Sequence, residues 1–383
     1  MKLVRFGDLC KLQNGRAFKP EEWSEEGTPI VRIQNLNDET KPFNYCNFDV
    51  EKRFWIDSGD LLFSWSGTPG TSFGAFFWNR GKGFLNQHIF RVDVKEEFVD
   101  KHYLRYALNS LIIKIIDQAH GGVGLKHITK AKLEEVQIPL PPLEQQRRIA
   151  FILDQADKLR QKRQQAIEKL DQLLQATFID MFGDPVSNPK GWEVGCIGDM
   201  LESVKYGSSD KATLEGEIPI LRMNNLTYSG EMDLRDLKYI TKVQADEKYL
   251  VKEGDILFNR TNSKELVGKT AVYVGPEPMA YAGYLVRGRT KENFAPEYIS
   301  AFLNSPWGKE KLQSMCKSIV GMANINAKEF QSIVLPIPPE NEQMHFKARV
   351  LAIREKKQLL VNQLNVFETL FKSLQNQAFN GTL

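Results

Sequence analysis

Apolar residues follow two kinds of spacing along this chain, and each kind occurs twice. In residues 1–142 and 185–339, short alternating or β-branched runs are separated by Gly, Pro and Asn, which is typical of a strand-rich domain with few helices. We expect strands at 29–33, 60–63, 89–94 and 270–274, and helices at 103–116 and 296–312. Each region ends at a Pro-Pro pair, where extended structure stops and a long helical pattern begins.

The two helical patterns have apolar residues at alternating spacings of three and four. The seams are Ile149, Ile152, Ala156, Leu159, Ala166, Leu170 and Leu173, and Phe346, Val350, Ile353, Leu360, Leu364, Phe367, Phe371 and Leu374. Such seams predict a coiled coil of two antiparallel helices, each of about 40 residues and about 60 Å. The alternative is that each helix packs on its own domain. Arg163 and Lys357 interrupt the seams, and we expect these charges to set the register at a cost in stability.

The sequence contains a long internal repeat. Pro29 to Leu36 returns as Pro219 to Leu226, Gly59 to Phe63 returns as Gly254 to Phe258, and Ile138 to Pro142 returns as Leu335 to Pro339. Shorter matches, such as Val123-Gly124 with Val320-Gly321, keep the same order. The duplication predicts an α/β (α+β) fold with two tandem strand-rich domains separated by two long helices. We expect the boundaries at 1–142, 143–184, 185–339 and 340–383.

The composition is that of a globular protein and identifies no partner. Of 383 residues, 42% are hydrophobic and 26% are charged, and the net charge of +3 permits nucleic-acid binding without identifying it. The four cysteines lie far apart without a Cys-x-x-Cys pair, so we expect thiols in a reducing compartment and no zinc site. No run approaches the roughly 20 apolar residues of a membrane span. We expect a cytoplasmic protein with no membrane partner.

Catalytic motifs are nearly absent from the sequence. It has no phosphate-binding Gly-x-x-x-x-Gly-Lys-Ser/Thr loop, and the glycine cluster at 121–124 is better explained as a flexible or close-approach loop. The five histidines show no helix-face pairing for a metal. The acids matched between the copies each follow a glycine, which is turn chemistry: Asp8 with Asp199, and Asp60 with Asp255. We expect no cofactor, no metal and no independent active site.

Three duplicated motifs together resemble the specificity subunits of type I restriction and modification enzymes, across essentially the whole chain. They are Val31 to Leu36 with Leu221 to Leu226, the Gly-Asp runs at Gly59 and Gly254, and Ile138 to Gln146. Each motif is weak alone, but the ordered and duplicated set is specific. The second proline motif, Pro338 to Gln343, departs from the first because it lacks the leucine.

The resemblance implies a non-catalytic subunit in which two target-recognition domains read a bipartite, asymmetric site in double-stranded DNA. It also implies association with methyltransferase (modification) subunits, which we expect to number two, and with restriction/translocase subunits that cut DNA. Helices lying along B-DNA for about 60 Å would cover about 18 base pairs, enough for two half-sites and an unread gap. The alternatives are a stand-alone nucleic-acid-binding scaffold without enzyme partners and a self-sufficient nuclease.

Candidate DNA contacts lie just past the apolar runs, because Arg, Asn and Gln suit base edges and Lys suits phosphates. In the first domain they are Arg32, Gln34, Asn35, Ser64, Trp65, Ser66, Lys126, His127 and Lys130. In the second domain they are Arg222, Asn224, Asn225, Asn259, Arg260, Asn262, Lys264, Asn324, Asn326 and Lys328.

Positions that are identical in the two copies should support structure or contact phosphate more than they discriminate between bases. This applies to Arg32 with Arg222 and to Asn35 with Asn225. The segment 64–66, Ser-Trp-Ser, differs from Asn-Arg-Thr at 259–261. These differing segments are therefore better candidates for specificity, although a local hydrophobic plug explains Trp65 equally well.

Overall fold

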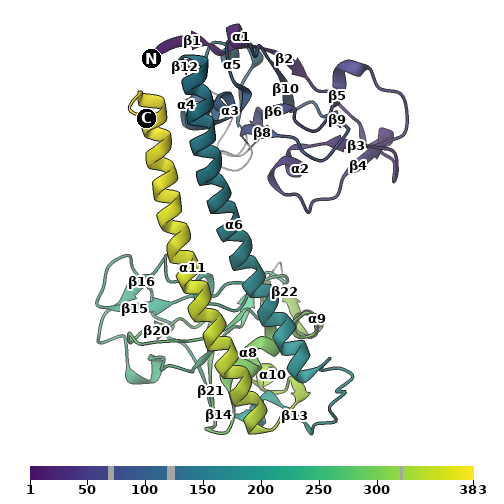
Figure 1. Cartoon of the computed structure of the whole chain (residues 1–383). Helices are drawn as coiled ribbons and strands as arrows, with labels where there is room; N and C mark the ends of the chain where they lie inside the picture. Colours follow the sequence, from purple (N-terminus) through teal and green to yellow (C-terminus); the bar gives the residue numbers. More distant parts are fainter. Residues whose placement is uncertain (68–72, 119–125, 320–321) are drawn as a thin grey trace. The chain divides into compact units, whose positions relative to one another are not determined.

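The chain divides into two compact units, each with its own core. The computed structural model describes residues 1–67, 73–118, 126–319 and 322–383. Unit 1 comprises residues 1–162 and 363–383, and unit 2 comprises residues 163–362. Each unit contains one strand-rich domain and a part of both long helices (Figure 1). The glycine cluster at 121–124 and its match at 320–321 lie outside the described residues.

Unit 1 is built on a four-stranded antiparallel sheet in the order β2-β10-β6-β8. These strands are β2 (Cys10–Asn14), β6 (Leu61–Ser64), β8 (Gly74–Phe77) and β10 (Ile89–Val94). A second sheet, β4-β3-β9-β5, contains β3 (Thr28–Val31), β4 (Asn44–Cys46), β5 (Trp55–Ile56) and β9 (Gly83–Leu85). Two further pairs join β1 (Lys2–Arg5) to β12 (Gln137–Leu140) and β7 (Ser66–Gly67) to β11 (Lys126–His127).

Unit 2 repeats this topology. Its four-stranded sheet, β14-β21-β17-β19, contains β14 (Leu201–Tyr206), β17 (Ile256–Asn259), β19 (Thr270–Val272) and β21 (Leu285–Thr290). The second sheet, β16-β15-β20, contains β15 (Ile218–Leu221), β16 (Lys238–Ile240) and β20 (Ala280–Tyr281). The remaining strands are β13 (Val194–Cys196) paired with β24 (Val334–Pro336), and β18 (Thr261–Asn262), β22 (Lys317–Ile319) and β23 (Met322–Asn324) in one sheet. The matching strand orders confirm the internal repeat.

The short helices of the two units also correspond. Unit 1 has α1 (Phe6–Leu9), α2 (Ile33–Asn37), α3 (Lys101–Ser110), α4 (Ile112–Asp117) and α5 (Lys130–Glu134), with 3₁₀ turns η1 (Pro20–Glu22) and η2 (Lys52–Phe54). Unit 2 has α7 (Ile197–Met200), α8 (Pro296–Asn304), α9 (Pro306–Met315) and α10 (Ala327–Gln331), with η3 (Met223–Asn225) and η4 (Glu247–Tyr249).

The helices predicted at 103–116 and 296–312 are each broken into two. In unit 2 the break is at Ser305, whose hydroxyl accepts a hydrogen bond from the Gly308 N–H and caps α9. Pro306 then begins α9, because proline fits the first turn of a helix but not its interior. In unit 1 the break is at Leu111, which has φ −95° and ψ 3°. The prediction of one continuous helix in each copy was therefore wrong.

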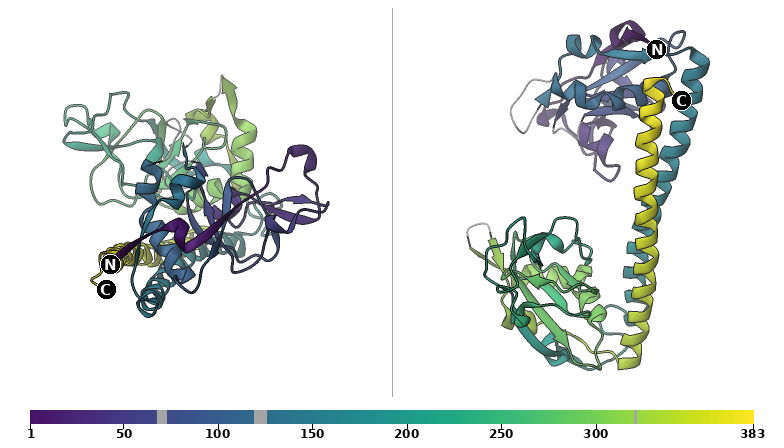
Figure 2. Two further views of the ribbon diagram at one scale, coloured as in Figure 1. Left: turned by 90° about the horizontal axis from the view of Figure 1, so that it is seen from above. Right: turned by 90° about the vertical axis from the view of Figure 1, so that its left-hand side faces the viewer.

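The two long helices are α6 (Leu143–Phe182, 40 residues) and α11 (Glu340–Asn380, 41 residues). In unit 1, Phe371 near the end of α11 shares a core with Ile149 and Leu153 near the start of α6. In unit 2, Phe178 near the end of α6 lies 5.9 Å from Phe346 near the start of α11, between ring centroids. Within each unit the two helix segments thus lie side by side and run in opposite directions (Figures 1 and 2), which confirms the predicted antiparallel pairing.

The predicted seam is only partly correct. Leu159 and Leu173 are each 48% exposed, whereas Leu153 and Ile167, which lie outside the predicted seam, are buried. Each helix packs on its domain as well as on the other helix, so the buried face is wider than a coiled-coil seam. Lys357 does interrupt the seam, but its ammonium pairs with Asp171 at 2.5 Å and with Glu231 at 2.7 Å.

A buried glutamine joins the start of each long helix to its domain. In unit 1 the Gln146 Oε1 accepts from the Asp100 N–H at 2.9 Å, and its Nε2 donates to the Pro141 carbonyl at 2.8 Å. In unit 2, Gln343 makes the same two bonds, to the Ala295 N–H and the Pro338 carbonyl. The loss of leucine from the second proline motif therefore leaves this contact unchanged.

Of the two matched pairs of Gly-Asp steps, the pair at Gly59 and Gly254 builds turns, as predicted, whereas the pair at Gly7 and Gly198 lies in the short helices α1 and α7. Gly59 and Gly254 have φ values of 95° and 87°, which glycine adopts without strain. The carboxylate of Asp60 accepts from the Asp57 N–H, and that of Asp255 accepts from the Lys252 N–H. Asp255 is buried and also pairs with the Arg289 guanidinium at 2.8 Å.

Candidate DNA interface

The segments that differ between the copies lie at a junction between two small sheets. In unit 1 the main-sheet strand β6 ends at Ser64, Trp65 follows, and β7 begins at Ser66. Ser66 is then paired with His127 on β11. We call the set of Ser64, Trp65, Ser66, Lys126 and His127 the unit 1 junction. It brings together two of the three predicted clusters of that domain.

The same junction exists in unit 2. There β17 ends at Asn259, Arg260 follows, and β18 begins at Thr261, which pairs with Asn324 on β23. The Asn324 amide also donates to the Thr261 hydroxyl at 2.9 Å. We call Asn259, Arg260, Thr261, Asn262 and Asn324 the unit 2 junction.

Aromatic packing dominates the unit 1 junction. The Trp65 ring stacks on Phe90 with centroids 5.6 Å apart and meets His88 edge-on at 5.3 Å. Burial, together with the nearby His127, lowers the pKa of His88 and so disfavours the charged form of its ring. Among the described residues, the Ser64 Oγ and the Trp65 Nε1 have no hydrogen-bond partner. This packing favours the plug interpretation of Trp65, because its indole N–H is buried and no ligand reaches it in this conformation.

The unit 2 junction carries a guanidinium at the same place. Arg260 lies 5.1 Å from the Tyr206 ring centroid, and its Nη1 donates to the Gly283 carbonyl at 3.3 Å. Stacking on a ring fixes the plane of the guanidinium and leaves other N–H groups for an acceptor. Asn262 and Lys264 follow directly, and the Lys264 side chain is exposed.

The Arg-x-x-Asn positions shared by the two copies hold the chain in place. Asn35 and Asn225 are each 1% exposed, and the Oδ1 of each accepts the backbone N–H of the arginine three residues earlier. Their amide Nδ2 atoms donate to carbonyls of the following loop, at Lys41 and Pro42 in one copy and Asp233 and Asp236 in the other. A structural role accounts for both asparagines, and no surface is left for base contact in this conformation.

The polar side chains near Asn35 and Asn225 also make hydrogen bonds or ion pairs within the protein. The Arg32 Nη1 donates to the Asn44 Oδ1 at 2.9 Å, and the Gln34 amide donates to the Pro42 carbonyl at 3.4 Å. Asp236 pairs with Arg222 at 3.0 Å and accepts from Asn224 at 2.8 Å. Contact with DNA would have to compete with these interactions.

The third predicted cluster mixes helix capping with exposed charge. Asn326 is the N-cap of α10, accepting from the Lys328 and Glu329 N–H groups; its Asn-x-x-Glu spacing signals this role in the sequence. Lys328 is exposed. Lys130 donates to the Leu12 carbonyl at 2.9 Å and lies 3.7 Å from the carboxylate of Glu134.

Lys269 was not among the residues predicted to contact DNA, because the predicted residues follow apolar runs and Lys269 comes directly before β19. Its ammonium donates to the Met223 carbonyl at 2.7 Å and the Leu226 carbonyl at 2.6 Å, and burial lowers its pKa. Asn262 also contacts the Met223 sulfur at 3.7 Å. These contacts place the segment 222–226 beside the unit 2 junction.

The described residues contain neither a metal cluster nor a membrane-spanning helix. Across residues 1–67, 73–118, 126–319 and 322–383, no group of three or more His, Cys, Asp or Glu is arranged to hold a metal ion. No helix within those ranges is both long and apolar enough to cross a membrane.

Comparison with known proteins identifies the repeated unit. The type I restriction modification DNA specificity domain matches residues 1–169 and again residues 189–367. The chain is 22% identical over 418 residues to the type I restriction enzyme EcoBI specificity subunit of Escherichia coli, covering 99% of this chain and 85% of that protein. It is 24% identical over 408 residues to the MjaVIII specificity subunit of Methanocaldococcus jannaschii, covering 100% and 92%.

Solved structures share the fold. The type I restriction-modification S subunit from M. genitalium aligns with a TM-score of 0.63 at 15% identity, over 99% of this chain and 96% of that one. A chain from a study of complex assembly and conformational transition of the type I R-M system aligns with a TM-score of 0.53 at 18% identity, over 100% and 98%. The predicted fold class and the resemblance are thereby confirmed. The chain belongs to the type I restriction-modification DNA specificity family, whose members are non-catalytic specificity subunits.

Proposed function

We propose that this chain reads a bipartite, asymmetric DNA target for a type I restriction-modification enzyme. The observation that carries the proposal is the contrast between Trp65 and Arg260 at matched junctions of two domains with the same strand order. The Arg260 guanidinium can donate two parallel hydrogen bonds to guanine, whereas the Trp65 ring is packed on Phe90 and offers no such pair of donors. Two domains with different junctions would read different half-sites.

Within this proposal, the residues divide into base readers and phosphate contacts. Arg260 is the leading candidate for a base reader because its guanidinium is oriented by Tyr206. Lys264 and Lys328 are exposed and suit phosphates. In unit 1 the candidates for DNA contact are Ser66 and His127, which pair with each other as Thr261 and Asn324 do in unit 2.

The domain boundaries of the proposal follow the Pro-Pro pairs. Residues 1–142 and 185–339 would be the target-recognition domains, and residues 143–184 and 340–383 would be the helical spacers. The helices of 40 and 41 residues would then determine how many base pairs separate the half-sites.

We further propose that the long helices dock the partner subunits. In unit 1 the large apolar side chains exposed on them are Phe151, Leu159, Val366 and Leu370; in unit 2 they are Leu173, Ile179, Leu351 and Leu359. Exposed apolar side chains in such number are typical of an interaction surface. One such surface in each unit supports two methyltransferase subunits, with restriction/translocase subunits joining the complex.

The experiment that tests the division of labour is a domain swap followed by methylation-site mapping. Replacing 185–339 with the same region of a relative should change one half-site and leave the other half-site and the gap unchanged. Inserting four residues at Gln164 should lengthen the gap by one or two base pairs, because four residues add about 6 Å to a helix. A swap that changed both half-sites would refute the proposal, as would methylation by the rigorously pure chain alone.

Two single substitutions separate reading from phosphate contact. Arg260→Ala should relax discrimination at one base position, at a cost of about 1 to 3 kcal/mol for the correct base. Lys264→Ala, four residues away, is the matched control and should weaken all sequences equally and flatten the salt dependence. Equal effects of the two substitutions on all sequences would remove Arg260 from the set of readers.

A further inference from the structure

Unit 2 contains a cavity of about 440 Å³ between α6, α8, α9 and α11, closed on one side by the loop 228–230. Its volume lies within the range of small-molecule sites. The apolar part of its wall includes Leu174, Phe178, Pro306, Trp307 and Val350. The cavity is separate from the unit 2 junction, since the two share no residue.

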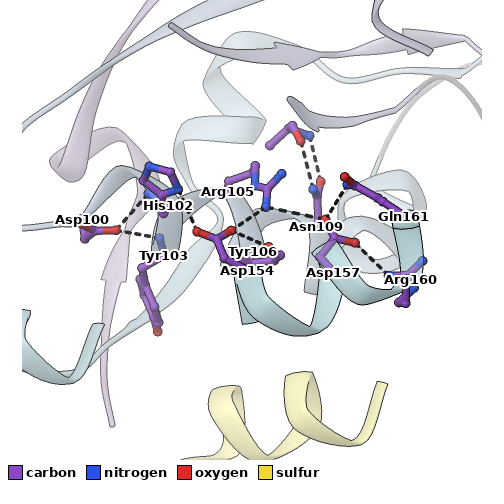
Figure 3. Close-up of polar contacts among 11 residues, drawn as sticks. Asp100, His102, Tyr103, Arg105, Tyr106, Asn109, Asp154, Asp157, Arg160 and Gln161 are labelled. Atoms are coloured by element: carbon purple, nitrogen blue, oxygen red, sulfur yellow. Dashed lines mark hydrogen bonds and ion pairs between the residues drawn. The ribbon is translucent and has the colours of Figure 1, made fainter. Parts of the chain in front are cut away.

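In unit 1 the matching positions of α3 carry two large side chains, Arg105 and Tyr106. Both contact Asp154 on α6 (Figure 3), at 3.2 Å from Arg105 and 2.7 Å from the Tyr106 hydroxyl. The repeat aligns Arg105 with Ser300 and Tyr106 with Ala301. The cavity therefore exists because unit 2 has two small residues where unit 1 has two large ones.

The acids that hold Arg105 are also replaced. Asp154 and Asp157 of unit 1 align with Leu351 and Arg354 of unit 2. Arg354 lines the cavity, and its Nη1 is buried without a hydrogen-bond partner among the described residues. Burial lowers the pKa of its guanidinium, although Glu297 and Glu231 act in the opposite direction. The unit 2 cavity thus presents a cation where unit 1 presents acids.

Two acceptors in the wall are also unsatisfied. Glu297 is only 4% exposed, and neither its Oε2 nor the Asn304 Oδ1 has a partner in the part of the chain that the structure describes. In unit 1, by contrast, the matching Asn109 uses both ends of its amide on the Ala75 backbone. A buried polar atom without a partner costs free energy, so a ligand that supplied donors here would be stabilised.

Lys309 and Asp171 are the remaining charged groups in the wall. The Lys309 ammonium donates to the Tyr228 carbonyl at 2.9 Å and lies 3.2 Å from the centroid of the Tyr228 ring, and burial lowers its pKa to about 8. Asp171 is already paired with Lys357. A ligand would therefore meet the unpartnered oxygens of Glu297 and Asn304, the unpartnered Nη1 of Arg354, the Lys309 ammonium with its remaining donors, and an apolar wall.

We propose that this cavity binds a free amino acid with an aromatic or large apolar side chain. The ammonium group would donate to Glu297 and Asn304, the carboxylate would pair with Arg354 and Lys309, and the side chain would pack between Phe178 and Trp307. The proposal does not depend on the DNA-reading function of the chain.

The test is isothermal titration of the full chain with L-phenylalanine and two truncated analogues. Phenethylamine lacks the carboxylate and 3-phenylpropionate lacks the ammonium group. Each should bind at least about tenfold more weakly than L-phenylalanine, because each leaves one charged partner unsatisfied. Absence of binding by L-phenylalanine at millimolar concentration would overturn the proposal, and 3-phenylpropionate binding as tightly would overturn the zwitterion assignment.

Variants that copy the filled site of unit 1 localise the binding. Ala301→Tyr should fill the cavity and abolish binding, whereas Ala352→Tyr at an exposed position of α11 should leave it unchanged. Glu297→Gln should weaken L-phenylalanine at least about tenfold but leave 3-phenylpropionate unaffected, which covers the case in which Ala301→Tyr fails to fold. Unchanged binding by a folded Ala301→Tyr would refute the site. Loss of a methyltransferase contact in that variant, with no amino acid bound by the parent chain, would instead make the cavity a protein interface and also refute the proposal.

Discussion

Unit 1 and unit 2 share their strand order but differ on the face of α3 or α8 that meets the long helices. In unit 1 this face is filled by Arg105 and Tyr106, while in unit 2 Ser300 and Ala301 leave a cavity. What is common to both is a buried tyrosine whose hydroxyl donates to a proline carbonyl: Tyr103 to Pro139, and Tyr298 to Pro336. The bonds from the buried tyrosines to the proline carbonyls are repeated, whereas the side chains that face the long helices have diverged in size and charge.

The largest effect is expected from exchanging the space-filling residues. Tyr106→Ala in unit 1 should lower the free energy of unfolding by about 3 to 5 kcal/mol, because it opens a cavity and leaves Asp154 without its hydroxyl partner. Ala301→Tyr is the reciprocal change and should cost little, since the space exists. Hydrogen exchange resolved to each unit would measure both. Equal losses in the two variants would mean that the cavity is not equivalent to the filled site.

The matched asparagines Asn109 and Asn304 should also contribute unequally to stability, with the larger contribution again in unit 1. Asn109→Ala removes two hydrogen bonds to the Ala75 backbone and should cost about 2 kcal/mol, because Ala75 is buried. Asn304→Ala removes a bond to the Thr270 carbonyl together with local bonds to Ser300, and should cost about 1 kcal/mol. Urea denaturation of the pair would measure the difference, and a larger loss for Asn304→Ala would contradict this interpretation.

Charges between the long helices provide a smaller contrast. A charge in an apolar seam was expected to reduce stability, but Lys357 is 12% exposed and bridges two acids. Lys357→Leu should therefore lower stability by about 1 kcal/mol, since it leaves both carboxylates without their partner. Arg160→Leu in unit 1 removes more exposed pairs with Asp157 and Glu368 and should cost less. A higher melting temperature for Lys357→Leu would instead support the original expectation that a charge in the seam reduces stability.

The smallest effect is a pH dependence specific to unit 2. The pKa of Lys309 is lowered from 10.5 to about 8 in the folded chain, so the unfolded chain binds more protons between these values. This lysine should make the free energy of unfolding rise as the pH increases from about 8 towards 10.5. Lys309→Met should lose the part of the rise that comes from this lysine and keep the part that comes from Lys269, whose pKa is also lowered by burial. Lys311→Met, at an exposed position of the same helix, should keep both parts. Parallel stability curves for all three proteins would exclude the effect.

Most of the fold could be predicted from the sequence because it depends on local apolar spacing and on the internal repeat. The alternating run 89–94 became β10, and the repeat of motifs became a repeat of sheet order. The break at Ser305 was missed because apolar spacing continued across it, although Ser305-Pro306 is a helix-start signal. The exposure of Leu159 was not predicted, because a heptad seam describes packing against one other helix, whereas each long helix packs on its domain as well as on the other long helix.

The candidate site was less predictable. The two asparagines of the Arg-x-x-Asn pairs hold backbone groups, while the absence of base contact at these pairs stays a prediction. The capping role of Asn326 was overlooked despite its spacing. The cavity could not be seen in either copy alone, because an empty space has no sequence motif. Its signal was the alignment of Arg105-Tyr106 with Ser300-Ala301, which becomes meaningful only once the filled version is known.

The two buried glutamines have a consequence for motion. Gln146 joins the start of α6 to the start of α3, and Gln343 joins α11 to α8, through amides that are almost fully buried. Fraying of a long helix at its first turn must therefore break the bond to the Asp100 or Ala295 N–H in the same event. These two amide protons should exchange with deuterium no faster than the helix end opens, so that each domain and the base of its helix open as one cooperative element.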